Sequence, residues 1–170
     1  MDARPLFAAA PSLSEWLVFL HVLVAFWFLG GILGRNLVIW RAARSTDVKV
    51  VDGLMDAAGR LEMLMVRPGS FAVLLLGLLA AWKEHLPWFE SGAYWLPTAL
   101  FVFLSAFILV PVIFIPRGKI FEHAMTESRS RGMVLPELTA AFRDPAVWFA
   151  RTYELVMLAF VISLMVLKPF

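Results

Sequence analysis

The sequence contains no cysteine and few charged residues. The lack of cysteine excludes disulfide frameworks, thiolate metal sites and cysteine nucleophiles. Charged residues make up 16% of the 170 residues and apolar residues 61%, whereas typical soluble domains contain about 25% and about 45–50%. A soluble fold of this length could not bury so much apolar surface, so the composition predicts a protein whose main solvent is lipid.

Sequence signatures of several function classes are also absent. The chain has no GxGxxG or phosphate-binding loop, no HExxH zinc motif and no methionine- or histidine-rich copper tract. No candidate nucleophile has a credible base beside it. The net charge is only +2, and the basic residues lie in short segments between apolar runs. This distribution indicates membrane topology rather than binding to nucleic acid.

Four apolar stretches are long enough to cross a bilayer, because a spanning helix needs about 20 mostly apolar residues. Ser12 or Ser14 is a suitable N-cap for the first of them. Tryptophan and tyrosine residues near several of the ends are typical of the headgroup level. The sequence therefore predicts a single integral membrane domain over residues 1–170, folded as an all-α membrane four-helix bundle. The predicted spans are residues 13–40, 61–82, 94–115 and 146–167.

Lysine and arginine are distributed unequally around these spans. One side of the expected topology carries only Arg4, Lys83 and Lys168. By the positive-inside rule, we expect both longer connecting segments in the cytoplasm and both termini on the outer side of a bacterial inner membrane. The basic residues of the two connecting segments are Arg41, Arg44, Lys49 and Arg60, and Arg117, Lys119, Arg129, Arg131 and Arg143.

The segment before the second span has the spacing of an amphipathic helix. Its apolar residues recur at intervals of three and four, with charged residues between them. We therefore expect a cytoplasmic amphipathic helix that leads into the membrane. The loop of residues 116–145 mixes charge, glycine and proline without one clear period, and we expect it to be partly helical. The apolar positions of the amphipathic segment are Val48, Val51, Leu54, Met55, Ala58 and Leu61.

Glycine and proline residues interrupt the apolar spans. Gly30, Gly31 and Gly34 lie one turn apart on the first span and include a GxxxG spacing, which favours close packing of a neighbouring helix. A tetrapyrrole plane against this flat face is the alternative. Pro68 and Pro111 interrupt the second and third spans, where each frees a carbonyl group one turn upstream and is expected to bend its helix.

Three ionisable residues stand out within the spans, where a charge costs about 2.5–3.5 kcal/mol on insertion scales. Arg35, Arg67 and Glu154 all fall about 8–12 Å inside the cytoplasmic boundary at 1.5 Å per residue, so they could meet in one layer. One interpretation is a structural ion pair between Arg67 and Glu154, with Arg35 extended to the headgroups. The other is an anion site for a carboxylate, a phosphate or a lipid headgroup, with Arg151 and Tyr153 beside it.

His21 lies in a different layer, about 21 Å along the helix axis from Arg35. A lone intramembrane histidine can donate a hydrogen bond between helices, carry protons or serve as an axial haem ligand. For haem b, Met157 or Met165 on the fourth span is the best candidate for a second iron ligand. Lys168 could reach a haem propionate or extend to the headgroups.

Two short motifs indicate a family. The first span reads Leu20-His21-Val22-Leu23-Val24-Ala25-Phe26-Trp27-Phe28-Leu29-Gly30-Gly31, and the chain ends Leu164-Met165-Val166-Leu167-Lys168-Pro169-Phe170. With these motifs the chain resembles small bacterial four-helix membrane proteins of unknown function that are grouped with the copper-resistance protein D family and the HemJ type of protoporphyrinogen oxidase. In those proteins an LHxxxxxxWxGG-like stretch and a VKP-like end recur.

The resemblance to HemJ implies a membrane haem protein that oxidises protoporphyrinogen, with His21 and Lys168 important. In this chain the His-to-Trp spacing is one residue shorter than in HemJ, and the third span contains no histidine. The uncharacterised branch of the group therefore fits better than the enzyme.

Two function hypotheses follow. In the first, the protein binds haem or another tetrapyrrole near His21, with Gly30 and Gly31 nearby, and acts in redox or cofactor handling. In the second, it is a non-catalytic accessory or scaffold subunit of a larger membrane complex or a homo-oligomer, as the near absence of polar groups in the third span indicates. No span carries a polar stripe that could line a water path, which argues against a channel.

Overall fold

A computed structural model of the chain describes residues 11–86, 88 and 94–169, and these residues form helices and no strands. Four helical stretches are long and apolar enough to cross a membrane. The predicted all-α membrane bundle of four helices is therefore confirmed. The elements are α1 (Leu13–Ala42), α2 (Val48–Leu61), the π-helical turn η1 (Glu62–Val66), α3 (Arg67–Lys83), α4 (Trp95–Leu109), the π-helical turn η2 (Val110–Phe114), α5 (Ile115–Arg131), α6 (Pro136–Phe142) and α7 (Pro145–Leu167).

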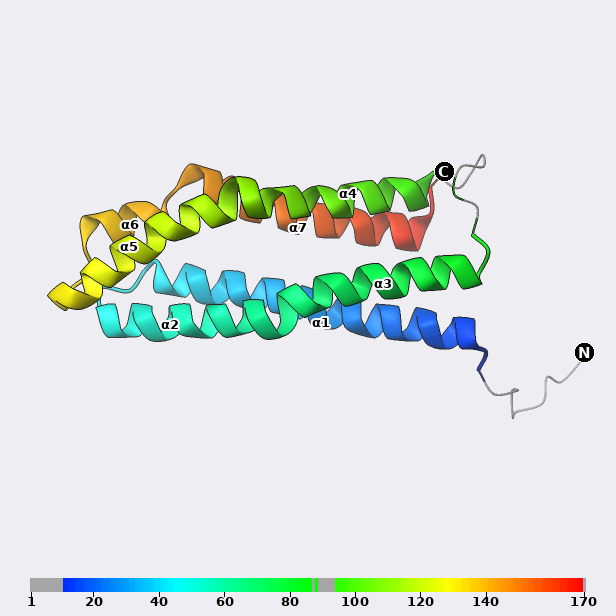
Figure 1. The fold of residues 1–170 in the computed structure, drawn as a ribbon, viewed down its shortest axis with the longest axis horizontal. Helices are drawn as coiled ribbons and strands as arrows, with labels where there is room; N and C mark the ends of the chain where they lie inside the picture. Colours follow the sequence, from blue (N-terminus) through cyan, green and yellow to red (C-terminus); the bar gives the residue numbers. More distant parts are fainter. Residues whose placement is uncertain (1–10, 87, 89–93, 170) are drawn as a thin grey trace, which may run out of the picture.

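The helices form two hairpins that lie against each other as two layers (Figure 1). In the first hairpin α1 packs along α2, η1 and α3, and in the second α4 packs along α7. The start of α1 and the end of α7 lie at the same end of the molecule as the end of α3 and the start of α4 (Figure 1). With four candidate spans, the start of α1 and the end of α7 lie on the same side of the bundle, and the side of the bilayer that they face stays a prediction.

The helices α1 and α7 have bounds close to the predicted spans 13–40 and 146–167, whereas the two middle helical stretches are longer than the predicted spans 61–82 and 94–115. The second helical stretch runs without a break from Val48 to Lys83 and the third from Trp95 to Arg131. At 1.5 Å per residue these helices are about 54–56 Å long, whereas the hydrocarbon core of a bilayer is about 30 Å thick. One end of the molecule, made of α2, α5 and α6, therefore projects beyond the apolar region.

The expected amphipathic segment is a helix, α2, and it buries Val48, Val51 and Ala58. Its apolar side packs with residues of α5 and α6, and Leu138 is fully buried in that cluster. An ion pair between Arg129 and Asp52 joins α5 to α2 at the surface. The projecting end thus has a small core of its own, and its placement on the cytoplasmic side stays a prediction.

Both long helices contain a π-helical turn that ends two residues before a proline. The N–H of Arg67 donates to the carbonyl oxygen of Glu62 just before Pro68. The N–H of Ile115 donates to Val110 in the same way, just before Pro116. Proline has no N–H and its ring collides with the carbonyl group four residues earlier, so a wider turn relieves the clash. Each helix changes direction at its π turn (Figure 1).

The glycines of α1 pack against the end of α2 and against η1 in the same hairpin. A Cβ atom added at Gly31 would lie 2.6 Å from Cβ of Met65, and one at Gly34 would lie 3.3 Å from Leu61. Met65 also lies against Gly30. The prediction of close helix packing is confirmed, and this face is filled by η1 rather than open to a planar cofactor.

Candidate intramembrane site

A mostly apolar cavity of about 440 Å³ lies between the two hairpins. Its walls come from α1, α3, α4 and α7, and aromatic side chains such as Phe28 and Phe103 form part of them. Pockets that bind small molecules and cofactors have volumes of about 300–1,000 Å³ and few polar groups. The charged and imidazole groups that line this cavity are His21, Glu84 and Lys168.

His21 is held by a hydrogen bond to the backbone of α3. Its Nδ1 lies 3.0 Å from the carbonyl oxygen of Val73. A carbonyl oxygen can only accept, so Nδ1 carries the hydrogen and donates it. In the neutral ring this leaves the lone pair on Nε2. A histidine that ligates a metal typically has this arrangement, with its other ring nitrogen bonded to a carbonyl or carboxylate group.

Lys168 lines the same cavity directly after the end of α7. Its backbone is left-handed, with φ of 44°, and its Nζ lies 5.3 Å from the centre of the Trp95 ring. An ammonium group over an aromatic face gains a cation–π interaction. Met165, one turn earlier on α7, also lines the cavity.

The structure brings together only some of the residues that the sequence predicts for a haem site. His21, Met165 and Lys168 line one cavity. Met157 instead belongs to the buried cluster that contains Phe28. Gly30 and Gly31 face η1, as described above. Of the two methionines proposed as a second iron ligand, Met165 is the one that shares the cavity with His21.

A second polar feature, the charge cluster, joins the two hairpins inside the apolar region. Arg35 on α1 donates to Glu62 at 2.6 Å and to Glu154 at 2.5 Å. The side chains of Arg35 and Glu154 are only 11% and 12% exposed. Arg67 pairs with Glu62 at 3.3 Å. The three predicted residues therefore meet in one layer, with Glu62 as a fourth member.

The expected ion pair between Arg67 and Glu154 is wrong. Arg67 is 63% exposed and contacts Glu62, whereas Arg35 crosses between the hairpins to reach Glu154. Depth along a helix follows from residue number, but the direction of a side chain around the helix axis does not follow from depth. Glu62 was not among the sequence candidates, although it is the second residue of the predicted span 61–82 and could have been treated like Arg67.

The residues expected beside this cluster have separate roles. Tyr153 bonds with Ser105 of α4 through their hydroxyl groups at 2.5 Å, which links α4 to α7. Arg151 lies one turn before Glu154 on α7 and is partly buried. Within the part of the chain that the structure describes, Arg151 has no ion pair within 4.0 Å.

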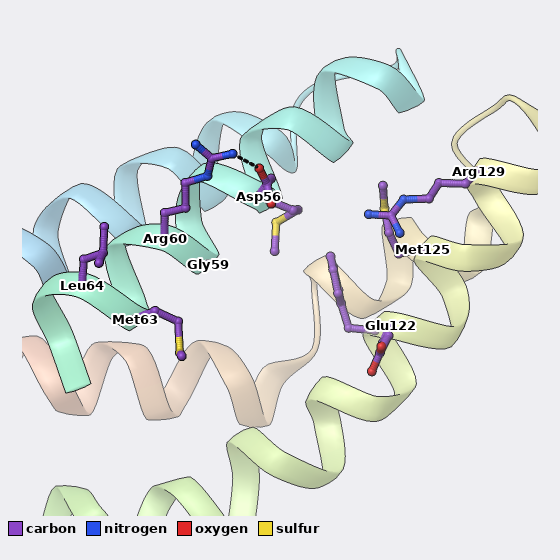
Figure 2. Close-up of a pocket in the computed structure, with 10 residues that line it drawn as sticks. Asp56, Gly59, Arg60, Met63, Leu64, Glu122, Met125 and Arg129 are labelled. Atoms are coloured by element: carbon purple, nitrogen blue, oxygen red, sulfur yellow. Dashed lines mark hydrogen bonds and ion pairs between the residues drawn. The ribbon is translucent and has the colours of Figure 1, made fainter. Parts of the chain in front are cut away.

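A third feature is a groove of about 600 Å³ between α2, η1 and α5. Figure 2 shows Asp56 and Arg60 on α2, joined by a hydrogen bond of 2.9 Å, with Glu122 and Arg129 on α5 across from them. Between these charged groups the lining is apolar and rich in methionine. The apolar lining residues are Met55, Met63, Leu64, Phe121 and Met125.

Comparison with known proteins identifies a family whose description names no activity. A family model described as "Predicted integral membrane protein (DUF2269)" matches residues 15–169. No curated protein and no solved structure matches the chain.

Proposed function

We propose, for a chain that belongs to the DUF2269 family of predicted integral membrane proteins, that the cavity between its hairpins binds haem b or a related tetrapyrrole. The observation that carries this proposal is His21, which lines the cavity with its Nδ1 bonded to the carbonyl oxygen of Val73. With Nδ1 bonded in this way, Nε2 of His21 would be the nitrogen that holds the iron.

Two further groups of the cavity, the ammonium of Lys168 and the thioether of Met165, suit the same ligand. Haem has a large apolar ring and two carboxylates, and the cavity is mostly apolar with an ammonium group at Lys168. Lys168 would bind a propionate, and Met165 would supply a thioether as second ligand to the iron. Bound haem supplies one-electron redox chemistry whose potential depends on its axial ligands and on burial. A role in redox or cofactor handling follows, as the resemblance to the copper-resistance protein D and HemJ group also implies.

Absorption spectroscopy tests this proposal. The chain would be expressed with ample haem and purified in mild detergent, and we expect a Soret band that His21→Ala removes. His123→Ala is the matched control, because His123 is exposed on α5 and does not line the cavity. We expect Lys168→Ala to lower haem retention and Lys168→Arg to preserve it. A wild-type protein without a Soret band, or a band that His21→Ala leaves unchanged, would overturn the proposal.

The alternative function is that of a non-catalytic scaffold that forms a homo-oligomer. The groove between α2 and α5 favours it, because two acidic and two basic side chains in one groove can complement the same groove of a second copy. Met63→Cys in the groove, in a chain without other cysteines, should give a crosslinked dimer, whereas Thr46→Cys in the α1–α2 loop should not. Crosslinking at neither site, with monomers only in mild detergent, would contradict this alternative.

We further propose that the protein lies in a bacterial inner membrane with both termini on the outer side. The support is the excess of lysine and arginine in the segments that contain α2, α5 and α6. In intact cells an impermeant maleimide should label His85→Cys, after α3, and should not label Thr46→Cys. The reverse labelling pattern would show the opposite orientation.

A further inference from the structure

The ring of His21 lies in a notch on the surface of α3. The notch is made by the carbonyl group of Val73 and by Gly77, one turn later. A Cβ atom added at Gly77 would lie 2.9 Å from Cε1 of His21 and 3.2 Å from its Nδ1. The imidazole therefore occupies the space that any other side chain at position 77 would fill.

The geometry of a helix explains why the notch needs a glycine. The carbonyl oxygen of residue 73 accepts the N–H of residue 77 within α3, and its second lone pair points outward. Cβ atoms tilt toward the N-terminus of a helix, so the side chain of residue 77 normally covers the turn that holds this carbonyl group. Without a Cβ, Gly77 leaves the second lone pair of Val73 accessible to a donor on α1.

The contacts of the other tightly packed glycines differ in kind. A Cβ atom at Gly31 would meet Met65, and one at Gly69 would meet Phe28 at 3.0 Å. Both neighbours are apolar, so these glycines bring two helices together. Of these three glycines, Gly77 is the one that faces a polar ring. The imidazole of His21 fills the space where a side chain at position 77 would lie, and it forms its hydrogen bond there.

We propose that Gly77 is a positioning residue that opens the Val73 carbonyl to His21. It thereby fixes the imidazole with its hydrogen on Nδ1 and leaves Nε2 free for a ligand. The notch itself does not depend on which ligand the cavity holds. Its consequence for iron ligation rests on the proposed function.

Nitrogen NMR of histidine side chains tests the notch in haem-free protein. With ¹⁵N-labelled histidine in detergent, we expect the neutral wild-type protein to show a ring protonated at Nδ1, assigned to His21 by its loss in His21→Ala. Gly77→Ala should remove this signal. Gly69→Ala, which crowds the same helix interface at Phe28, and Gly59→Ala, which has nothing within 4 Å, should keep it. A signal that survives Gly77→Ala, or that Gly69→Ala removes equally, would overturn the proposal.

A double-mutant cycle covers the case in which Gly77→Ala folds poorly. Gly77→Ala should lower the Tm in the wild-type background but not in the His21→Ala background. The second background lacks the ring with which the new methyl group collides. An equal loss of Tm in both backgrounds would show that the clash is not with His21.

The haem-loaded protein separates this proposal from the proposed function. Loss of an outer partner of a metal-ligating histidine typically lowers metal affinity about 10–100-fold. We expect Gly77→Ala to weaken haem binding by about this factor and Gly59→Ala to leave it unchanged. If the NMR result holds but no protein shows a Soret band, the haem proposal fails and the positioning role of Gly77 stands. If haem binds equally well with alanine at position 77, the positioning role for iron ligation fails.

Discussion

Removal of Arg35 tests the pairing inside the charge cluster. Arg35→Met keeps much of the side-chain volume but leaves Glu62 and Glu154 without their shared partner. Glu154 then has no ion-pair partner within 4.0 Å among the described residues, whereas Glu62 keeps Arg67. Arg35 and Glu154 are about nine-tenths buried. This substitution therefore removes one partner of a buried ion pair and leaves the other partner charged.

The structure sets the expected size of the effect. Breaking a buried ion pair from one side costs about 3–5 kcal/mol, so we expect Arg35→Met to destabilise the fold by about this amount. Arg67→Met removes an exposed pair at 3.3 Å, and we expect a cost of about 0–1 kcal/mol. Arg35 also connects the hairpins, so its loss should loosen one layer against the other.

Unfolding of the purified protein in mixed micelles, with increasing fractions of SDS, measures these differences through helical circular dichroism. The double mutant Arg35→Met with Glu154→Gln should be more stable than the two separate costs predict, with a coupling of about 0.5–3 kcal/mol. Arg67→Met combined with Glu154→Gln should show a smaller coupling, because these two residues are linked only through Glu62 and Arg35. An equal or larger coupling between Arg67 and Glu154, or a larger cost for Arg67→Met than for Arg35→Met, would refute the pairing that the structure shows.

Three further predictions concern packing and polar contacts. Gly31→Ala should cost about 1–3 kcal/mol in the same unfolding assay, because its methyl group would collide with η1; Gly59→Ala, in open space, should instead stabilise by about 0.5–1 kcal/mol. Tyr153→Phe removes the hydroxyl bond to α4 and should cost about 0.6 kcal/mol, a typical value between membrane helices; a cost near zero would show that the bond does not stabilise the fold. Arg129→Ala removes a surface ion pair to α2 and should cost about 0.2–1 kcal/mol, less at high salt; a cost independent of salt would contradict this.

The four crossings could be predicted because each depends on a local run of apolar residues. The start of α1 was also predictable. Ser12 caps it in a capping box with Glu15, and the two residues are only three positions apart in the sequence. The common layer of Arg35 and Glu154 followed from helix rise alone.

The partners within that layer could not be predicted. Arg35 reaches Glu154 because α1 and α7 face each other with a particular rotation, and rotation depends on the packing of all four helices. By contrast, the spacing before the second span does predict a helix that leads into the membrane, and Val48–Lys83 is one continuous helical stretch although its apolar run begins only near Leu61.

For the candidate site, the sequence by itself determined that an imidazole, a thioether and an ammonium group lie near one end of the spans. Only the tertiary structure decided that His21, Met165 and Lys168 share a cavity, that Met157 lies outside it, and that His21 donates to Val73 beside Gly77. The reason is that a backbone carbonyl is present at every residue and leaves no mark in the sequence. Whether it is free to accept a bond depends on which helix lies against it and on the side chain one turn later.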